Sequence, residues 1–345
     1  MFRNTFLLIL FLLLSYVEVL GDDLNKADSI FQNLCSRCHG SDGRGVEDFA
    51  KLGLDVPPAN FTDPAFNSRE PKYVWKRVIR DGGARHGYSS FMPSFGGVLS
   101  EKKIDELVGY IKNLGYDPKY PQGELNFTRS FFTSKAFPED EIIYIGNFGR
   151  SSDKASYKQT FYFAKRLGPV FQLEIKNTFV HSNDFSGEIE GGVKWNIVHL
   201  EESLIISSLG LELSLPYSSD EKFSYIPYIA FGKGFGPKVS LQASSKLKHS
   251  PSSGDMEIIL SSVLHYVPTI EVGRVIIPAI EFLADYKDKK VIPFVVPQLY
   301  FSLTRRGHVA LNLGFKQLLR KNDEKFSVVG FLLWEFVDGW FFEGW

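Results

Sequence analysis

The sequence predicts a two-domain chain in which an all-α domain is followed by a larger, all-β antiparallel domain. Up to about residue 116, apolar residues recur three and four positions apart, which is the period of an amphipathic helix. From about residue 124 onward, apolar and polar residues alternate, which is the period of a strand with one apolar face. Residues 117–123 are polar, contain two prolines and separate the two patterns. We therefore predict a first domain at 22–116, a linker at 117–123 and a second domain at 124–345.

Three helices are predicted in the first domain. An apolar stripe over residues 27–34 leads directly into Cys35. A second stripe begins after Pro71, which suits a first helical turn, and stops at Gly82. A third begins after Ser100, a residue that caps helix N-termini.

The most informative motif is the run Cys35-Ser36-Arg37-Cys38-His39 at the end of the first predicted helix. The spacing C-x-x-C-H is the attachment signature of a c-type haem. Two thiols three positions apart can each form a thioether with one porphyrin, and the next residue then presents its imidazole to the iron. Cys35 and Cys38 are therefore predicted to bind one haem c covalently, and His39 to be the proximal iron ligand.

Other sites that use paired cysteines fit less well. A structural zinc ion takes four ligands, but no H-x3-5-H spacing accompanies the two cysteines, which are the only ones in the chain. A thioredoxin-like pair does not need His39 and lies in a βαβ pattern, which is missing around this motif. A structural disulfide between residues three positions apart would be strained.

Met92 is the predicted second axial ligand. An electron-transfer haem needs a sixth ligand, and a thioether raises the potential relative to a second histidine. The chain has three methionines: Met1 is the initiator, and Met256 lies in a strand-like stretch. Met92 is followed by Pro93 and lies on a predicted loop, which argues against a methionine that only fills a core gap. His86 is the rival ligand.

Residues from about 24 to 115 resemble a class I, mitochondrial-type cytochrome c domain in its bacterial single-haem form. In order, the matching features are C-x-x-C-H-G, Gly43-Arg44-Gly45, residues 57–63, a central helix, Met92-Pro93 and a last helix. The resemblance covers under a third of the chain. It implies an all-α fold around one haem, axial ligation by His39 and Met92, and transfer of single electrons with a periplasmic or membrane redox protein.

The amino terminus predicts export. Residues 1–21 contain one early positive charge, Arg3, then an apolar run, and they are followed by Asp22 and Asp23. This is the pattern of a secretory signal peptide. The resemblance also implies export, because in bacteria covalent haem attachment takes place outside the cytoplasm.

The second domain contains roughly ten to twelve predicted strands, which two architectures could use. In a transmembrane β-barrel the apolar face contacts lipid and the polar face lines the interior, with aromatic residues at both interfaces. In a soluble β-sandwich the apolar face forms the core between two sheets. Long strands and an aromatic content of 15% favour the barrel. The terminal Trp345 resembles, imperfectly, the aromatic ending of bacterial outer-membrane barrels.

The predicted function is electron transfer by a covalently bound haem that an outer-membrane barrel tethers at the periplasmic side. Residues 124–345 show neither a nucleophile elbow nor a helical H-E-x-x-H. We therefore expect an electron carrier and not an enzyme, with no nucleic-acid partner. Two alternatives stay open: a redox-linked transport pore, which an unobstructed polar lumen would favour, and a soluble periplasmic oxidoreductase with a β-sandwich.

Overall fold

The computed structural model describes residues 26–151, 154–182, 185–218, 222–269, 275–319 and 325–343. These residues form two compact units, one of residues 26–85 and 89–117 and the other of residues 86–88 and 118–343. The predicted signal peptide and Trp345 lie outside the described residues. Among the helices of the described part, none is both long enough and apolar enough to span a bilayer.

The first unit is helical, as the sequence predicts. Its main helices are α5 (Lys72–Asp81) and α6 (Glu101–Leu114), and a continuous helical run leads into the C-x-x-C-H motif. That run and the remaining short elements are α2 (Ala27–Ile30), the π-helical turn η1 (Phe31–Cys35), α3 (Ser36–His39), and the shorter η2 (Phe49–Leu52), α4 (Pro64–Asn67) and η3 (Ala84–His86).

Helix α6 forms much of the core of this unit. Its N-terminus is capped by Ser100, whose Oγ accepts a hydrogen bond from the amide of Lys103 at 3.4 Å, as the sequence predicts. The helix buries apolar side chains at helical spacing against the first helical run; they are Ile104, Leu107, Val108 and Ile111. The side-chain amide of Asn67 donates to the carbonyls of Phe61 and Ile111, so that it ties the loop containing Phe61 to α6.

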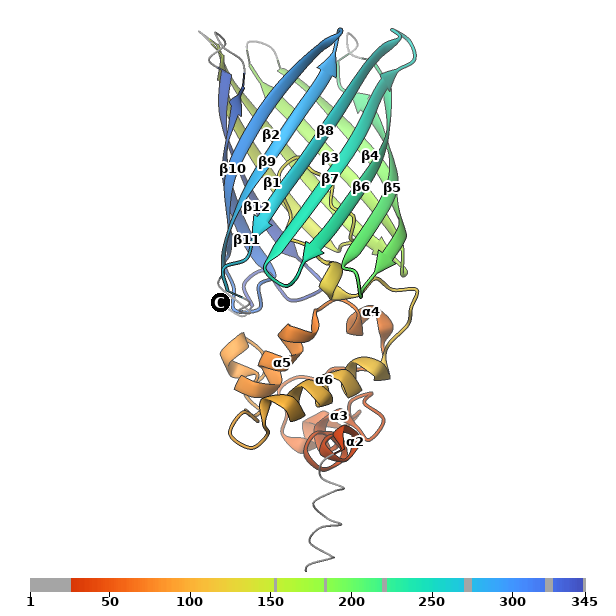
Figure 1. Ribbon diagram of the computed structural model, residues 1–345, viewed down its shortest axis with the longest axis vertical. Helices are drawn as coiled ribbons and strands as arrows, with labels where there is room; N and C mark the ends of the chain where they lie inside the picture. Colours follow the sequence, from red (N-terminus) through yellow and green to blue (C-terminus); the bar gives the residue numbers. More distant parts are fainter. Residues whose placement is uncertain are drawn as a thin grey trace, which may run out of the picture. The chain divides into compact units, whose positions relative to one another are not determined.

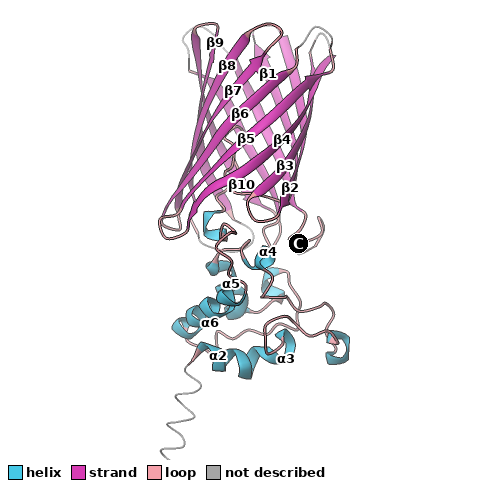
Figure 2. Cartoon of the chain, turned by 90° about the vertical axis from the view of Figure 1, so that its right-hand side faces the viewer, coloured by secondary structure: helices cyan, strands magenta, loops and turns pink. Residues whose placement is uncertain are grey.

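The second unit is a closed antiparallel barrel, in which each strand pairs with its sequence neighbours and β1 pairs with β12 (Figures 1 and 2). Twelve strands are described, in agreement with the predicted number. They are β1 (Glu141–Ser151), β2 (Lys154–Leu167), β3 (Phe171–His181), β4 (Phe185–Leu200), β5 (Ile205–Pro216), β6 (Ser224–Phe235), β7 (Val239–Ser250), β8 (Asp255–Tyr266), β9 (Ile276–Lys287), β10 (Lys290–Ser302), β11 (Val309–Leu318) and β12 (Lys325–Glu335).

The apolar faces of the strands point outward, and the polar faces line the lumen. On β5, the side chains of Leu211 and Leu213 are 43% and 45% exposed, whereas Glu212 and Ser214 between them are 3% and 1% exposed. The same alternation recurs on β3, where Phe171 is exposed and its neighbour Gln172 is buried. A sandwich would require the apolar faces to pack against each other, so the sandwich alternative is wrong. An outer surface this apolar is typical of a barrel that faces hydrocarbon.

The lumen contains a segment that the sequence did not predict. The first strand begins at Glu141, because residues 123–140 fold into the barrel; we call them the lumenal segment. It begins with the turn η4 (Gly123–Leu125) and appears in yellow within the barrel in Figure 1. It hydrogen-bonds to inward side chains of strands on every side of the ring, which places it inside; they are Gln172, Lys194, Ser208, Gln242, Ser244 and Glu281.

A buried ion pair joins the lumenal segment to the first residue of the wall. The guanidinium of Arg129 forms two hydrogen bonds with the carboxylate of Glu141, one of them at 3.0 Å, and the Glu141 side chain is fully buried. Replacing Glu141 with alanine leaves the guanidinium buried without its partner, so we expect the free energy of unfolding to fall by about 3–5 kcal/mol. Urea unfolding in detergent micelles measures the change. The double variant Arg129→Met with Glu141→Leu removes both charges and should be close to neutral; an equal loss in both variants would contradict this explanation.

Candidate functional site

The C-x-x-C-H motif lies on one helical run. Cys35 ends η1, while Cys38 and His39 lie in the single turn of α3. Both cysteines are free thiols with partly buried side chains. The predicted anchors and the predicted proximal ligand are therefore brought together by local structure alone.

Two glycines form the turn that ends this helical run. Gly40 has a φ of +74° and Gly45 a φ of +85°, both in the region that favours glycine. The amide of Gly45 donates to the carbonyl of His39 at 2.7 Å. A Cβ on Gly40 would lie 2.7 Å from the carbonyl oxygen of Gly45, which is too close for any other residue. The sequence that follows the motif thus fixes the end of the helix and the position of His39.

The imidazole of His39 is half-buried against an aromatic ring. Its ring stacks on Phe61, with ring centroids 4.5 Å apart and planes 24° from parallel. Burial lowers the pKa of His39 below its usual value. The ring is therefore neutral at physiological pH, which is the protonation state that can ligate iron.

The thiol of Cys35 is protected from ionisation. Burial, assisted by the nearby Cys38, raises the pKa of Cys35 to about 11. Because the thiolate is the form that attacks another sulfur, this cysteine is a poor partner for disulfide exchange at neutral pH.

Met92 is held by hydrogen bonds between its loop and the end of α5. The carbonyl of Met92 accepts from the amide of Gly83 at 3.0 Å. Further along the loop, the amide of Phe95 donates to Ile79 at 3.0 Å. Met92 and Cys35 both pack against the core cluster that contains Phe61. The rival ligand His86 is buried in η3.

The pocket has one unmet polar atom that a porphyrin carboxylate could satisfy. Among the described residues, the buried Nε1 of Trp75 finds no hydrogen-bond partner. Trp75 packs against the same cluster as Cys35 and Met92, and its ring lies 5.4 Å from that of Phe61. Buried donors are rarely left unpaired. The thiol of Cys35, the thioether of Met92 and the unpaired indole N–H of Trp75 lie around one apolar cluster, and the imidazole of His39 stacks on its member Phe61, an arrangement that fits a haem.

These residues can be compared with known families at this point. Residues 22–111 match the family model described as cytochrome C oxidase, cbb3-type, subunit III. The match confirms the predicted resemblance of this region to a cytochrome c domain, and it covers all of the C-x-x-C-H motif and Met92. The cytochrome c domain is thus a little over a quarter of the chain. A search of curated proteins found no match.

Solved structures resemble the barrel. A KdgM porin in complex with disordered oligogalacturonate has 12% identity and a TM-score of 0.44, and covers 57% of this chain and 99% of that one. A NanC porin has 12% identity and a TM-score of 0.44, with coverages of 56% and 98%. An outer membrane channel from Pseudomonas putida F1 has 10% identity and a TM-score of 0.42, with coverages of 60% and 99%. Likenesses this distant say nothing about the solutes of this barrel.

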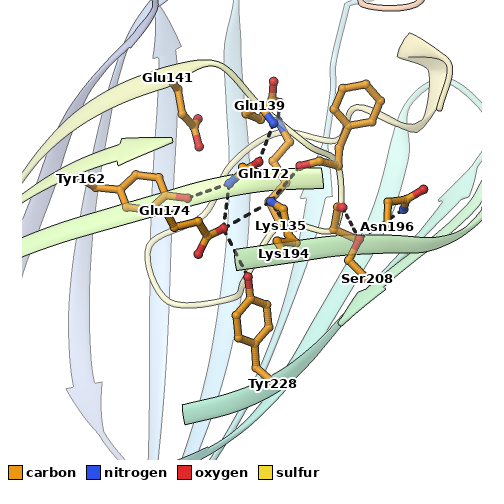
Figure 3. Close-up of polar contacts among 12 residues, drawn as sticks. Lys135, Glu139, Glu141, Tyr162, Gln172, Glu174, Lys194, Asn196, Ser208 and Tyr228 are labelled. Atoms are coloured by element: carbon orange, nitrogen blue, oxygen red, sulfur yellow. Dashed lines mark hydrogen bonds and ion pairs between the residues drawn. The ribbon is translucent and has the colours of Figure 1, made fainter. Parts of the chain in front are cut away.

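A second polar site, which the sequence analysis missed, lies in the lumen. Figure 3 shows the carboxylate of Glu174 accepting hydrogen bonds from Gln172 at 2.7 Å and from Tyr228 at 3.2 Å. The ammonium of Lys194 lies 3.6 Å from the same carboxylate and donates to two carbonyls of the lumenal segment at 3.0 Å. Each of these side chains is at an inward position of its own strand, which alternation can predict. That they contact one another follows only from the closure of the barrel, which alternation does not predict.

Proposed function

We propose that the chain is an electron carrier of the bacterial cell envelope, with one haem c bound to its cytochrome c domain and a barrel that anchors it in the outer membrane. Cys35 and Cys38 form the thioethers, and His39 and Met92 ligate the iron. When bound, the haem supplies reversible uptake of a single electron. The observation that carries this proposal is the C-x-x-C-H helix end, with both thiols free and the half-buried imidazole stacked on Phe61.

The protein residues keep the site suited to electron transfer. Phe61 holds the plane of the His39 ring by stacking, and the loop bonded to α5 holds Met92. The apolar cluster packs against Met92 and, through Phe61, against the ring of His39. Trp75 offers an indole N–H that can donate to a carboxylate of the porphyrin.

The barrel suits an anchor at the periplasmic side. The outward apolar faces favour hydrocarbon, and the even number of strands puts the start of β1 and the end of β12 at the same end of the barrel. Eight residues, 115–122, lie between the end of α6 and η4. They join the two units by a short covalent connection of about 28 Å at most.

Electrons are exchanged on the periplasmic side. The sequence has two cysteines, enough for one C-x-x-C-H haem. A single haem does not conduct across a hydrocarbon layer about 30 Å thick. The donor and the acceptor are therefore redox proteins or small redox molecules that reach the periplasmic face.

Replacing Met92 with alanine tests the second axial ligand. We expect the haem to stay covalently bound, while the reduced iron gains an open position that binds carbon monoxide and the midpoint potential falls, because the thioether that raises it is lost. Carbon monoxide difference spectra and a redox titration measure both effects. Met256→Ala is the matched control, since Met256 is an exposed residue of β8. An unchanged potential in Met92→Ala would contradict this assignment.

A further inference from the structure

The lumenal segment obstructs the barrel. It contacts β3, β4 and β5 on one side and β7 and β9 on the other. Its apolar side chains Leu125, Ala136 and Phe137 are 1–2% exposed and form a core with the inward residues of β5 and β6. A packed core of this kind fills the space between the segment and this part of the wall.

The strongest attachment is at Glu281, an inward residue of β9. Its carboxylate accepts hydrogen bonds from three successive backbone amides of the lumenal segment, those of Phe131 at 3.3 Å, Phe132 at 3.0 Å and Thr133 at 2.6 Å. The hydroxyl of Thr133 donates to it at 2.7 Å, and Gln298 on the neighbouring strand at 3.1 Å. Successive backbone amides around one anion form a nest, in which each bond is strengthened by the charge.

The two aromatic rings beside this nest pack on the same stretch of the lumen wall, along β9 to β12. The ring of Phe131 meets that of Phe331 on β12 edge-on, with centroids 5.2 Å apart. Phe132 lies under the ammonium of Lys316, 4.8 Å from the ring centroid. Both rings pack against a buried cluster from β9, β10 and β12. The tip of the segment is therefore held to this stretch of the wall by hydrogen bonds to Glu281 and by apolar contact.

The lumen wall of β3 to β7 carries paired charges. Lys176 lies 2.7 Å from Glu212 and 3.3 Å from Glu190. Lys246 lies 3.2 Å from the same Glu212. Charges of both signs line this part, and none of these ion pairs involves the lumenal segment. A polar, charged lumen wall is found both in barrels that hold a water-filled channel and in barrels whose lumen is plugged.

We propose that the barrel is a pore that its own residues 123–140 keep closed, with Glu281 as the residue that holds the closing segment in place. Release of the segment would open a path for small ions and small hydrophilic solutes, with weak charge selectivity because both signs line the wall. This inference is independent of the haem, since it rests on contacts within the barrel alone.

Conductance in planar lipid bilayers tests the proposal with the full, haem-loaded chain. We expect the native protein to insert without open-channel steps in potassium chloride. Glu281→Ala removes the nest and should give frequent open-channel steps. Replacing residues 126–138 with a glycine-serine linker of the same length should give steady open channels, and a salt gradient should then give a reversal potential near zero.

Glu190→Ala is the matched control, because Glu190 is also an inward carboxylate but pairs with Lys176 and not with the lumenal segment. It should leave the pore closed. The heat-dependent gel mobility of each variant confirms that the barrel is folded, and the haem absorbance confirms that the cytochrome c domain is unchanged. Steady conductance of the native protein would overturn the proposal, and so would a closed pore in the folded linker variant.

Discussion

Replacing both Cys35 and Cys38 with serine is expected to abolish covalent haem completely while the barrel still reaches the membrane. The chain has no other cysteine, so no thioether can form elsewhere, and the barrel strands pair only with one another. A denaturing gel stained for haem, beside an immunoblot of the same samples, measures the loss.

The control for this variant is Ser36→Ala, a substitution between the two cysteines. The hydroxyl of Ser36 donates only to the carbonyl of Gln32, at 2.6 Å, so its loss should leave the haem stain unchanged. Haem that stays with the double-serine chain after boiling in detergent would contradict attachment through this motif.

An arginine in place of Leu211 is expected to destabilise the barrel strongly. Leu211 lies at the middle of β5 and points outward, so the substitution puts a charge near the bilayer midplane, at a cost of about 2–4 kcal/mol in the free energy of unfolding. Urea unfolding of the barrel in lipid vesicles measures this cost.

How the cost of an arginine varies along the outer surface distinguishes a surface that faces lipid from one that faces water. Leu200 also points outward but ends β4, where an arginine near the interface should cost only about 0–1 kcal/mol. Equal and small costs at Leu211 and Leu200 would mean that the outer surface of the barrel faces water.

Local patterns were enough to predict most of the elements. The cap at Ser100 and the stop at Gly82 confirmed the predicted helix boundaries, because each depends on one or two neighbouring residues. The alternation within the strands predicted which residues share a face. It could not decide whether the apolar face points outward or into a core, because alternation is the same in both cases; closure between β1 and β12 decides it.

The lumenal segment could not be predicted, for a different reason. Phe131 and Phe132 stand side by side, so residues 123–140 show neither the period of a helix nor that of a strand. Their key partner Glu281 is about 150 residues away in the sequence. A buried carboxylate in a strand that reads Ile280-Glu281-Phe282 looks like any other lumenal residue. The lumenal segment obstructs the barrel. This argues against the alternative of a redox-linked transport pore, because an unobstructed polar lumen would favour that alternative.

The measurement that tests the central claim most directly is protease accessibility of the haem in cells that express the full chain. Outer membranes are first isolated on a density gradient, and the haem-stained band should be found there at the mass of the chain. In intact cells, added protease should leave this band unchanged. Once the protease can enter the periplasm, cleavage near residues 117–123 should release a small soluble fragment that carries all of the haem. Haem found only in the soluble periplasm, or haem lost from intact cells, would contradict a carrier anchored on the periplasmic side of the outer membrane.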